Sequence, residues 1–98
     1  MRTILISGAN RGIGLQIAYK QLTDGNRVSL GIRNIKSLKG SIIDPELWPR
    51  DQISISHYDA LDHNSSQDWI ENTVDKFGGF DTLINCAGVF SRVPFLYD

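Results

Sequence analysis

Residues 7–14 read Ser7-Gly8-Ala9-Asn10-Arg11-Gly12-Ile13-Gly14, and they join a short apolar run to a helical pattern. The run, Thr3 to Ser7, is continuously apolar in its middle, which is typical of a strand buried on both faces. At such a junction Gly8 permits a tight turn, Gly12 lets the backbone approach a phosphate, and Gly14 lets the helix pack close to the strand. The helix N-terminus adds free N–H groups and a partial positive charge. The sequence therefore predicts that this turn binds a diphosphate.

The spacing of the glycines narrows the kind of nucleotide site. It is G-x-x-x-G-x-G rather than G-x-G-x-x-G, and no Lys-Ser or Lys-Thr pair follows the second glycine. A phosphate-binding loop of the NTPase type is therefore not expected, and neither is ATP hydrolysis. A plain strand-to-helix turn remains the alternative interpretation.

The helix after the turn and the strand that follows it are predicted from local patterns. Apolar residues Ile13, Ile17, Ala18 and Leu22 form a helical stripe, which Asp24-Gly25-Asn26 closes with Gly25 in a left-handed C-cap. Residues 27–32 alternate apolar with small residues, as a second strand does. The small residues Ser29 and Gly31 leave room for a bulky neighbour, and we expect a ligand on that face.

Three further segments complete the pattern. Residues 34–50 predict a short helix and a loop, because Pro45 and Pro49 interrupt any regular period. Residues 52–58 predict a third strand, followed by Asp59. A capping box at residues 65–68 predicts a helix that ends at Gly78-Gly79, and its expected apolar face consists of Trp69, Ile70, Val74 and Phe77. Residues 81–86 predict a fourth strand that runs into Ala87-Gly88, whereas residues 90–98 have no clear period.

Strands that alternate with helices indicate a parallel sheet built by right-handed crossovers. We therefore predict an α/β fold with a doubly wound parallel sheet, in the strand order three-two-one-four, of which only the amino-terminal nucleotide-binding half is present. Residues 1–98 would form one domain that is incomplete at its carboxyl end, because strand four would keep an unpaired edge. A genuinely short protein is the alternative to a fragment.

Composition excludes several classes of protein. The chain is 41% hydrophobic and 21% charged with a net charge of -1, so disorder and a broad nucleic-acid interface are not expected. Its single cysteine, Cys86, cannot form an internal disulfide, and His57 and His63 lie too far from any cysteine cluster to predict a metal site. No apolar run is long enough for a signal peptide or a membrane span. We expect a cytoplasmic protein.

Three motifs in this order resemble those of the short-chain dehydrogenase/reductase family. Residues 7–14 resemble its T-G-x-x-x-G-I-G turn with Ser for Thr, and Asn85-Cys86-Ala87-Gly88 resembles its N-N-A-G motif with Cys for the second Asn. Asp59 matches the aspartate that contacts adenine in the family, although it could be only a turn residue. The resemblance implies a Rossmann-type fold that binds NAD(P). The implied cofactor-binding residues are Gly8, Asn10, Arg11, Gly12, Ile13, Gly14, Arg33, Asp59, Asn85, Ala87 and Gly88.

The end of the second strand predicts which nicotinamide cofactor is preferred. NAD-binding versions of the fold place an acidic residue there, about 20 positions after the glycine turn, to accept hydrogen bonds from the ribose. This sequence has Ile32-Arg33-Asn34 instead. Arg33 and Arg11 can both pair with a 2′-phosphate, so we expect NADPH to be favoured over NADH. Solvated surface arginines are the alternative.

No catalytic residue is assigned in this chain. The family's chemistry resides in a Tyr-x-x-x-Lys pair with an upstream serine, whereas Tyr19 is followed four positions later by Thr23 and Tyr58 by Asp62. The resemblance implies an oxidoreductase that moves hydride between nicotinamide and a small carbonyl or alcohol substrate, and that forms a homo-oligomer in its full-length form. A catalytically silent dinucleotide-binding or sensor module is the main alternative, and a methyl-donor-binding transferase is a further one.

Overall fold

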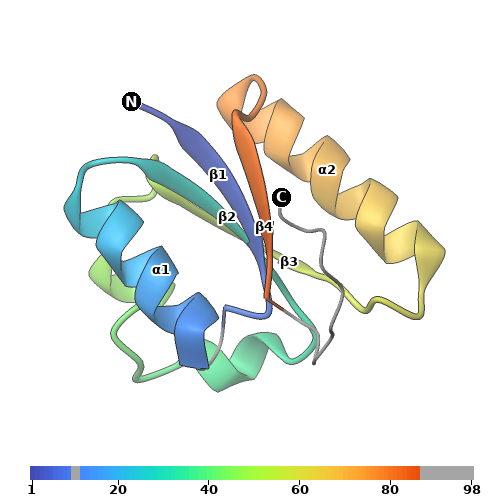
Figure 1. Ribbon diagram of the computed structural model, residues 1–98, viewed down its shortest axis with the longest axis horizontal. Coiled ribbons are helices and arrows are strands. Elements are labelled where there is room, and N and C mark those ends of the chain that lie inside the picture. Colours follow the sequence, from blue (N-terminus) through green and yellow to red (C-terminus); the bar gives the residue numbers. More distant parts are fainter. Residues whose placement is uncertain (10–11, 87–98) are drawn as a thin grey trace.

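A computed structural model describes residues 1–9 and 12–86 of the chain. Its four strands form one parallel sheet in the order β3-β2-β1-β4, with α1 on one face and α2 on the other (Figure 1). The strands span Thr3–Ser7 (β1), Arg27–Ile32 (β2), Ile53–His57 (β3) and Thr82–Asn85 (β4). The predicted α/β class and strand order are therefore confirmed. Residues 90–98 lie outside the described residues.

Helix α1, Gly12–Thr23, is the first element after β1. It packs against the core through a face that includes the small residues Gly14 and Ala18. Its buried residues are Gly14, Ala18 and Leu22. Gly25 has a φ of 86° and its N–H donates to the Leu22 carbonyl, which confirms the left-handed C-cap. The expectation that Ile13 belongs to the buried stripe is wrong, because 74% of this side chain is exposed. Ile13 lies in the first turn, where the helix has only begun to cover the sheet.

The two faces of the sheet differ in chemistry. Parallel register places Ile4, Val28 and Ile53 side by side, with Ile6 and Leu30 in the next row. These residues form the apolar core, together with residues of α1 and of the connection after β2. The opposite face carries small and polar residues, among them Ser29 and Gly31. Burial of the first face provides the main hydrophobic contribution to stability.

Helix α2, His63–Phe77, covers the polar face of the sheet through Trp69 and Thr73. The Trp69 Nε1–H donates to Ser29 Oγ (3.0 Å), Ser29 Oγ lies 2.6 Å from Thr73 Oγ1, and the Thr73 hydroxyl donates to the Trp69 carbonyl (2.8 Å). The Trp69 ring lies over Gly31, where an added Cβ would come within 2.8 Å of it. The predicted bulky neighbour is thus confirmed. The expected ligand over Ser29 and Gly31 is wrong, because the indole already fills that position.

The start and the exposed side of α2 differ from the sequence prediction. Asp62 is the N-cap and its side chain accepts from the Asn64 N–H, so the helix begins at His63 and not at a box opened by Ser65. Ser65 instead accepts from the Asp59 N–H, which ties the helix to the end of β3. Ile70 and Val74 are exposed, so the predicted apolar face is wrong there. The buried positions are Ser65, Trp69 and Thr73, spaced four residues apart.

The connection after β2 differs from the sequence prediction, whereas the edge strand β4 agrees with it. The predicted short helix and loop are two 3₁₀ helices, η1 at Ile35–Leu38 and η2 at Pro45–Leu47. Within residues 1–9 and 12–86, β4 pairs with β1 and with no other strand. Leu83 of β4 is 55% exposed on the α2 side of the sheet, because α2 lies over β3 and β2, which are not adjacent to β4. The unpaired edge that the sequence predicted is therefore present in the described part of the chain.

Candidate functional site

The carboxyl ends of all four strands meet at one edge of the sheet, because the strands are parallel. This edge carries Gly8 after β1, Arg33 after β2, Asp59 after β3 and Asn85 at the end of β4. The topology thus brings together predicted site residues that are up to 77 positions apart in the sequence, counting from Gly8 to Asn85. Four others, Asn10, Arg11, Ala87 and Gly88, lie outside the described residues.

The glycine turn is built by three different constraints. Gly8 has a φ of 69°, and its N–H donates to the Gly31 carbonyl of β2 (3.0 Å). Gly12 has a φ of 63°, and apart from its chain neighbours an added Cβ there would meet no atom of the described residues within 4 Å. Gly14 is the opposite case, since an added Cβ would lie 2.6 Å from the Gly8 carbonyl oxygen. The turn therefore packs the helix start tightly on its inner side and leaves it open at Gly12.

The open side of the turn has the chemistry of an anion site. The first N–H groups of an α-helix have no partner within the helix, and they attract an anion at its N-terminus. No acidic residue lies in the first turn of α1, so no carboxylate of that turn competes with a phosphate. The exposed Ile13 side chain stands next to Gly12 and adds an apolar surface beside it. A ligand there would meet backbone donors and one apolar side chain.

The end of β4 is tied to the end of β1. The Ser7 hydroxyl donates to Asn85 Oδ1 (2.6 Å), and the Cys86 N–H donates to the Ser7 carbonyl (3.1 Å). The Cys86 Cβ lies 3.1 Å from the position that a Cβ on Gly14 would take. Burial raises the pKa of the Cys86 thiol, which keeps it protonated and unreactive at neutral pH. Cys86 therefore packs against the glycine turn at Gly14.

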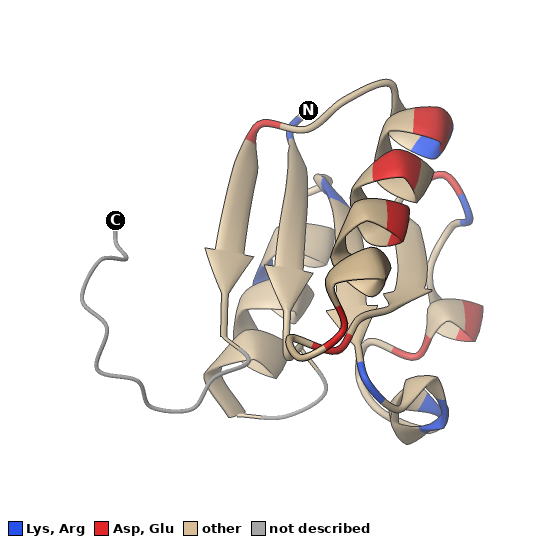
Figure 2. Ribbon diagram, turned by 90° about the vertical axis from the view of Figure 1, so that its right-hand side faces the viewer, with Lys and Arg blue, Asp and Glu red and all other residues tan. Residues whose placement is uncertain are grey.

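Arg33 is exposed directly after β2, and the backbone around it is held on both sides. The Tyr58 N–H donates to the Ile32 carbonyl before it (3.0 Å), and Asn34 caps η1 after it by accepting from the Lys36 N–H (3.2 Å). Within the described residues the only ion pair joins Lys20 to Asp24, so no carboxylate neutralises Arg33. Figure 2 shows basic residues around η1 at this edge and acidic residues along α2. An anion near Arg33 would find an uncompensated cation.

Asp59 has a turn role in the structure. Its Oδ1 accepts from the Leu61 N–H (3.0 Å), and its carbonyl accepts from the Asp62 N–H (2.8 Å). The residue is half-buried, and only one carboxylate oxygen is used in this turn. The turn therefore holds the carboxylate in place at the edge of the sheet, and the structural role that the sequence left open is present.

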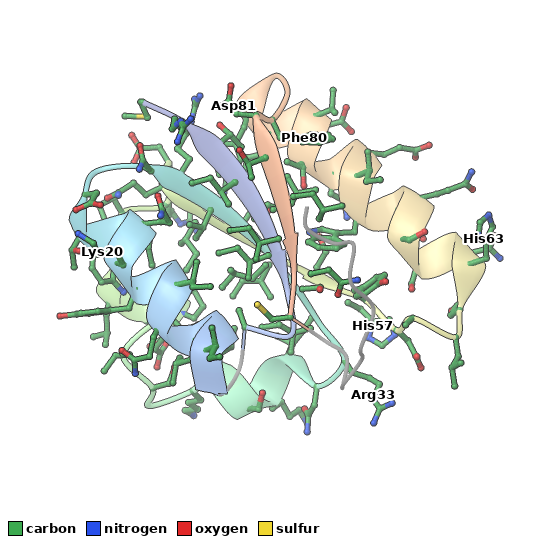
Figure 3. The ribbon with its side chains drawn as sticks, in the orientation of Figure 1. Lys20, Arg33, His57, His63, Phe80 and Asp81 are labelled. Atoms are coloured by element: carbon green, nitrogen blue, oxygen red, sulfur yellow. The ribbon has the colours of Figure 1, made fainter. Side chains whose placement is uncertain are left out.

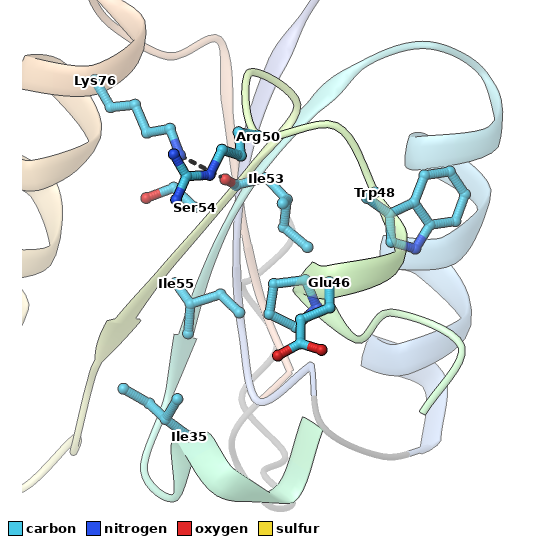
Figure 4. A pocket seen from close by; sticks show the side chains of 9 residues that line it. Ile35, Glu46, Trp48, Arg50, Ile53, Ser54, Ile55 and Lys76 are labelled. Carbon is cyan, nitrogen blue, oxygen red and sulfur yellow. Dashed lines mark hydrogen bonds between the residues drawn. The ribbon is translucent and has the colours of Figure 1, made fainter. Parts of the chain in front are cut away.

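A groove of about 590 Å³ lies elsewhere, on the outer edge of β3 (Figure 4). Ile35, Trp48, Arg50 and Lys76 are among its lining residues, and none of the predicted cofactor residues lines it. Lys76 Nζ donates to the Ile53 carbonyl (2.7 Å), as the dashed line in Figure 4 marks. A charged side chain bonded to a strand edge protects that edge from pairing with another chain. The groove is thus separate from the candidate cofactor site.

One residue at the site was missed by the sequence reasoning. His57 Nδ1 lies 3.2 Å from the Arg33 carbonyl oxygen. The sequence predicts His57 within the third strand, residues 52–58, and Arg33 directly after the second, and their proximity follows only from the strand register. A search of the strand ends for polar side chains next to a predicted cation would have found it.

Residues 1–9 and 12–86 contain no group of three His, Cys, Asp or Glu side chains placed to hold a metal ion. In the same residues, no helix has the length and apolar character that crossing a membrane requires.

Comparison with known proteins gives consistent matches over nearly the whole chain. The model of the short chain dehydrogenase family matches residues 2–97. Agropine synthesis reductase from Rhizobium rhizogenes is 39% identical over 85 residues, which are 87% of this chain and 19% of that protein. A short-chain dehydrogenase/reductase structure from Brucella melitensis, also described as glucose/ribitol dehydrogenase, superposes with a TM-score of 0.81 at 28% identity. The superposition covers 96% of this chain and 38% of that one.

A second solved structure was determined with a cofactor. The C-domain of a bacterial malonyl-CoA reductase with NADP superposes with a TM-score of 0.78 at 26% identity, covering 90% of this chain and 15% of that one. The chain therefore spans well under half the length of each of these relatives.

Proposed function

This chain belongs to the short-chain dehydrogenase family, and from that membership we propose that it forms the cofactor-binding part of an NADP(H)-dependent oxidoreductase. The whole protein would transfer hydride between the nicotinamide and a small carbonyl or alcohol substrate. Relatives named as a reductase and a dehydrogenase support this class of reaction. Because the chain spans 19% and 38% of those two relatives, the residues that bind the substrate would lie in parts of the protein outside this sequence.

The geometry of the glycine turn is the observation that carries the proposal. Contact between Gly14 and the Gly8 carbonyl brings the N-terminus of α1 to the end of β1, and the open space at Gly12 leaves that N-terminus accessible. A diphosphate there would accept hydrogen bonds from backbone N–H groups with no side chain between them. We therefore assign the diphosphate to residues 8–14.

The preference for the phosphorylated cofactor rests on Arg33. Its planar guanidinium can pair with a 2′-phosphate through two parallel hydrogen bonds. Among the described residues Arg33 forms no ion pair, so phosphate binding would not have to break one. The NADP in the malonyl-CoA reductase structure is consistent with a phosphorylated cofactor on this fold. Arg11 is proposed to act with Arg33, although it lies outside the described residues.

Each group at the edge has a defined task in this proposal. When bound, the cofactor would supply or accept the hydride. The chain itself would hold the diphosphate on the α1 N-terminus and the 2′-phosphate on Arg33. Ile13 would cover the cofactor with an apolar side chain, which excludes water locally. The bond from Ser7 to Asn85 keeps β1 and β4 at a fixed spacing beside it.

Substitution of Arg33 by alanine tests the preference. We expect Arg33→Ala to weaken NADPH binding by about 10- to 100-fold, because charge-assisted hydrogen bonds contribute roughly 1.5–3 kcal/mol. NADH carries a hydroxyl in place of the phosphate, so its affinity should change little. Both dissociation constants are measured by nicotinamide fluorescence with the 98-residue chain. Arg50→Ala is the matched control, since Arg50 is exposed in the separate groove at the β3 edge. Equal losses for NADPH and NADH would contradict the assignment.

A further inference from the structure

His57, the last residue of β3, lies beside Arg33 at the edge of the sheet (Figure 3). The strand register aligns His57 with Ile32 of β2. The imidazole of His57 can therefore reach the carbonyl group of Arg33, the residue after Ile32. Its Nδ1 lies 3.2 Å from the Arg33 carbonyl oxygen. No other hydrogen bond to that carbonyl occurs within residues 1–9 and 12–86.

The chemistry of the contact fixes the proton on the imidazole. A carbonyl oxygen only accepts, so Nδ1 must carry a hydrogen and donate it. In the neutral ring this selects the Nδ1–H tautomer and leaves Nε2 as an acceptor. The bond therefore forms in both the neutral and the charged state of His57, and it does not depend on protonation of the ring.

The His57 contact is the third interaction that restrains the backbone of residues 32–34. The Ile32 carbonyl is held by the Tyr58 N–H, and Asn34 is held by its cap on η1. The peptide group between Arg33 and Asn34 lies between these two bonded points, and His57 contacts its carbonyl oxygen. The side chain of Arg33 then starts from a fixed backbone, although it is itself exposed. A fixed starting point reduces the ordering cost when the guanidinium binds an anion.

We propose that His57 is a positioning residue for Arg33 and thereby a determinant of the preference for a phosphorylated adenosine ribose. This inference rests on the proposed function. It assigns His57 no contact with the cofactor and no proton transfer. Loss of His57 should therefore weaken the binding of NADPH and leave NADH binding unchanged. A general role in stability would weaken the binding of both nucleotides.

Two substitutions separate the hydrogen bond from the ring. His57→Ala removes the donor, and we expect it to weaken NADPH binding by about 3- to 10-fold, the contribution of one ordinary hydrogen bond. NADH binding should not change. In His57→Asn the amide nitrogen can take the place of Nδ1 and donate to the same carbonyl, so NADPH affinity should return to within about twofold of the original, well inside the contribution of that bond.

A double-mutant cycle and a control complete the test. In the Arg33→Ala background, His57→Ala should have no further effect on NADPH binding, because the group that it positions is gone. His63→Ala is the control, since His63 is also exposed but lies at the start of α2, away from Arg33 (Figure 3). Each variant is compared by circular dichroism and thermal unfolding, so that a loss of folded protein is recognised.

The outcomes distinguish the inference from the function on which it rests. Equal weakening of NADH and NADPH by His57→Ala, or failure of His57→Asn to restore NADPH binding, would overturn the role of His57. Failure of the unmodified chain to bind either nucleotide would instead refute the proposed function. The tautomer gives an independent check, because ¹⁵N chemical shifts of the imidazole must report a protonated Nδ1 at pH 8 if the bond is present.

Discussion

Gly14→Ala is expected to weaken NADPH and NADH binding to the same extent and to lower the free energy of unfolding by about 3 kcal/mol. The added Cβ would lie 2.6 Å from the Gly8 carbonyl oxygen and 3.1 Å from the Ala9 Cα, both of which belong to the backbone. Backbone atoms cannot rotate away as a side-chain end can, so α1 must shift away from the end of β1. The shift would separate the N–H groups of the helix from the rest of the turn.

Gly40→Asn is the control for this substitution. Gly40 also lies outside the strands, at a φ of 82°, and an added Cβ would meet nothing within 4 Å. Asparagine tolerates the left-handed region better than other residues, so a change of less than about 1 kcal/mol is expected. Urea unfolding and nucleotide fluorescence measure the two effects of Gly14→Ala. A variant that kept its stability, or that lost NADPH binding alone, would contradict close packing as the role of Gly14.

Gly31→Val is expected to destabilise the fold by about 3 kcal/mol, which corresponds to a fall in melting temperature of roughly 10–20 °C for a domain of this size. Valine favours strands, so local propensity alone predicts the opposite sign. The cost comes from Trp69, whose ring atoms would lie 2.8 Å from the first added carbon. The indole cannot move freely, because its Nε1–H is bonded to Ser29 and its ring packs against Tyr58 at 4.9 Å between centroids.

A second substitution tests whether Trp69 causes this cost. In a Trp69→Leu background the smaller side chain leaves room over β2, so Gly31→Val should cost at least about 1 kcal/mol less than in the original chain. Thermal and urea unfolding of the four proteins give the coupling energy. Strict additivity of the two substitutions would exclude the contact as the reason for glycine at position 31.

At the carboxyl edge of the sheet we expect two kinds of residue: those that maintain the fold and those that select the ligand. Gly14 and Gly31 act on the backbone and on the helices, so their loss should affect every nucleotide and the fold itself. Arg33 and His57 are exposed, so their loss should affect the phosphorylated nucleotide and leave the fold intact. Failure of this division would show that specificity and stability are not separate properties of the edge.

Much of the fold could be predicted because its signals are local. The strands, the helix after the glycine turn and the Gly25 cap each depend on residues within a few positions of one another, and the structure confirms them. Parallel connectivity places Gly8, Arg33, Asp59 and Asn85 at one edge of the sheet, whereas the cofactor roles of Asp59 and Asn85 were implied by the family resemblance. The nucleotide roles of these residues stay predictions until binding is measured.

The sequence predictions for α2 were wrong at positions where contacts with distant segments determine the role of a side chain. Ser65 matches a helix start locally, but its hydroxyl is used by the Asp59 N–H, and Asp62 caps the helix instead. Ile70 and Val74 match an apolar face, yet Trp69 and Thr73 take the contact with the sheet because β2 presents small residues there. A pattern within one helix cannot show which side the sheet will accept.

The sequence by itself determined the order of the elements, the class of the sheet and the position of the glycine turn, since each follows from short-range periodicity and glycine conformation. Only the tertiary structure decided that the indole of Trp69 fills the face over Gly31 and that His57 holds the backbone of Arg33. Both contacts join segments 24 or more residues apart, across a register that packing selects. Side chains on neighbouring strands meet according to that register, and no pattern within a single segment contains it.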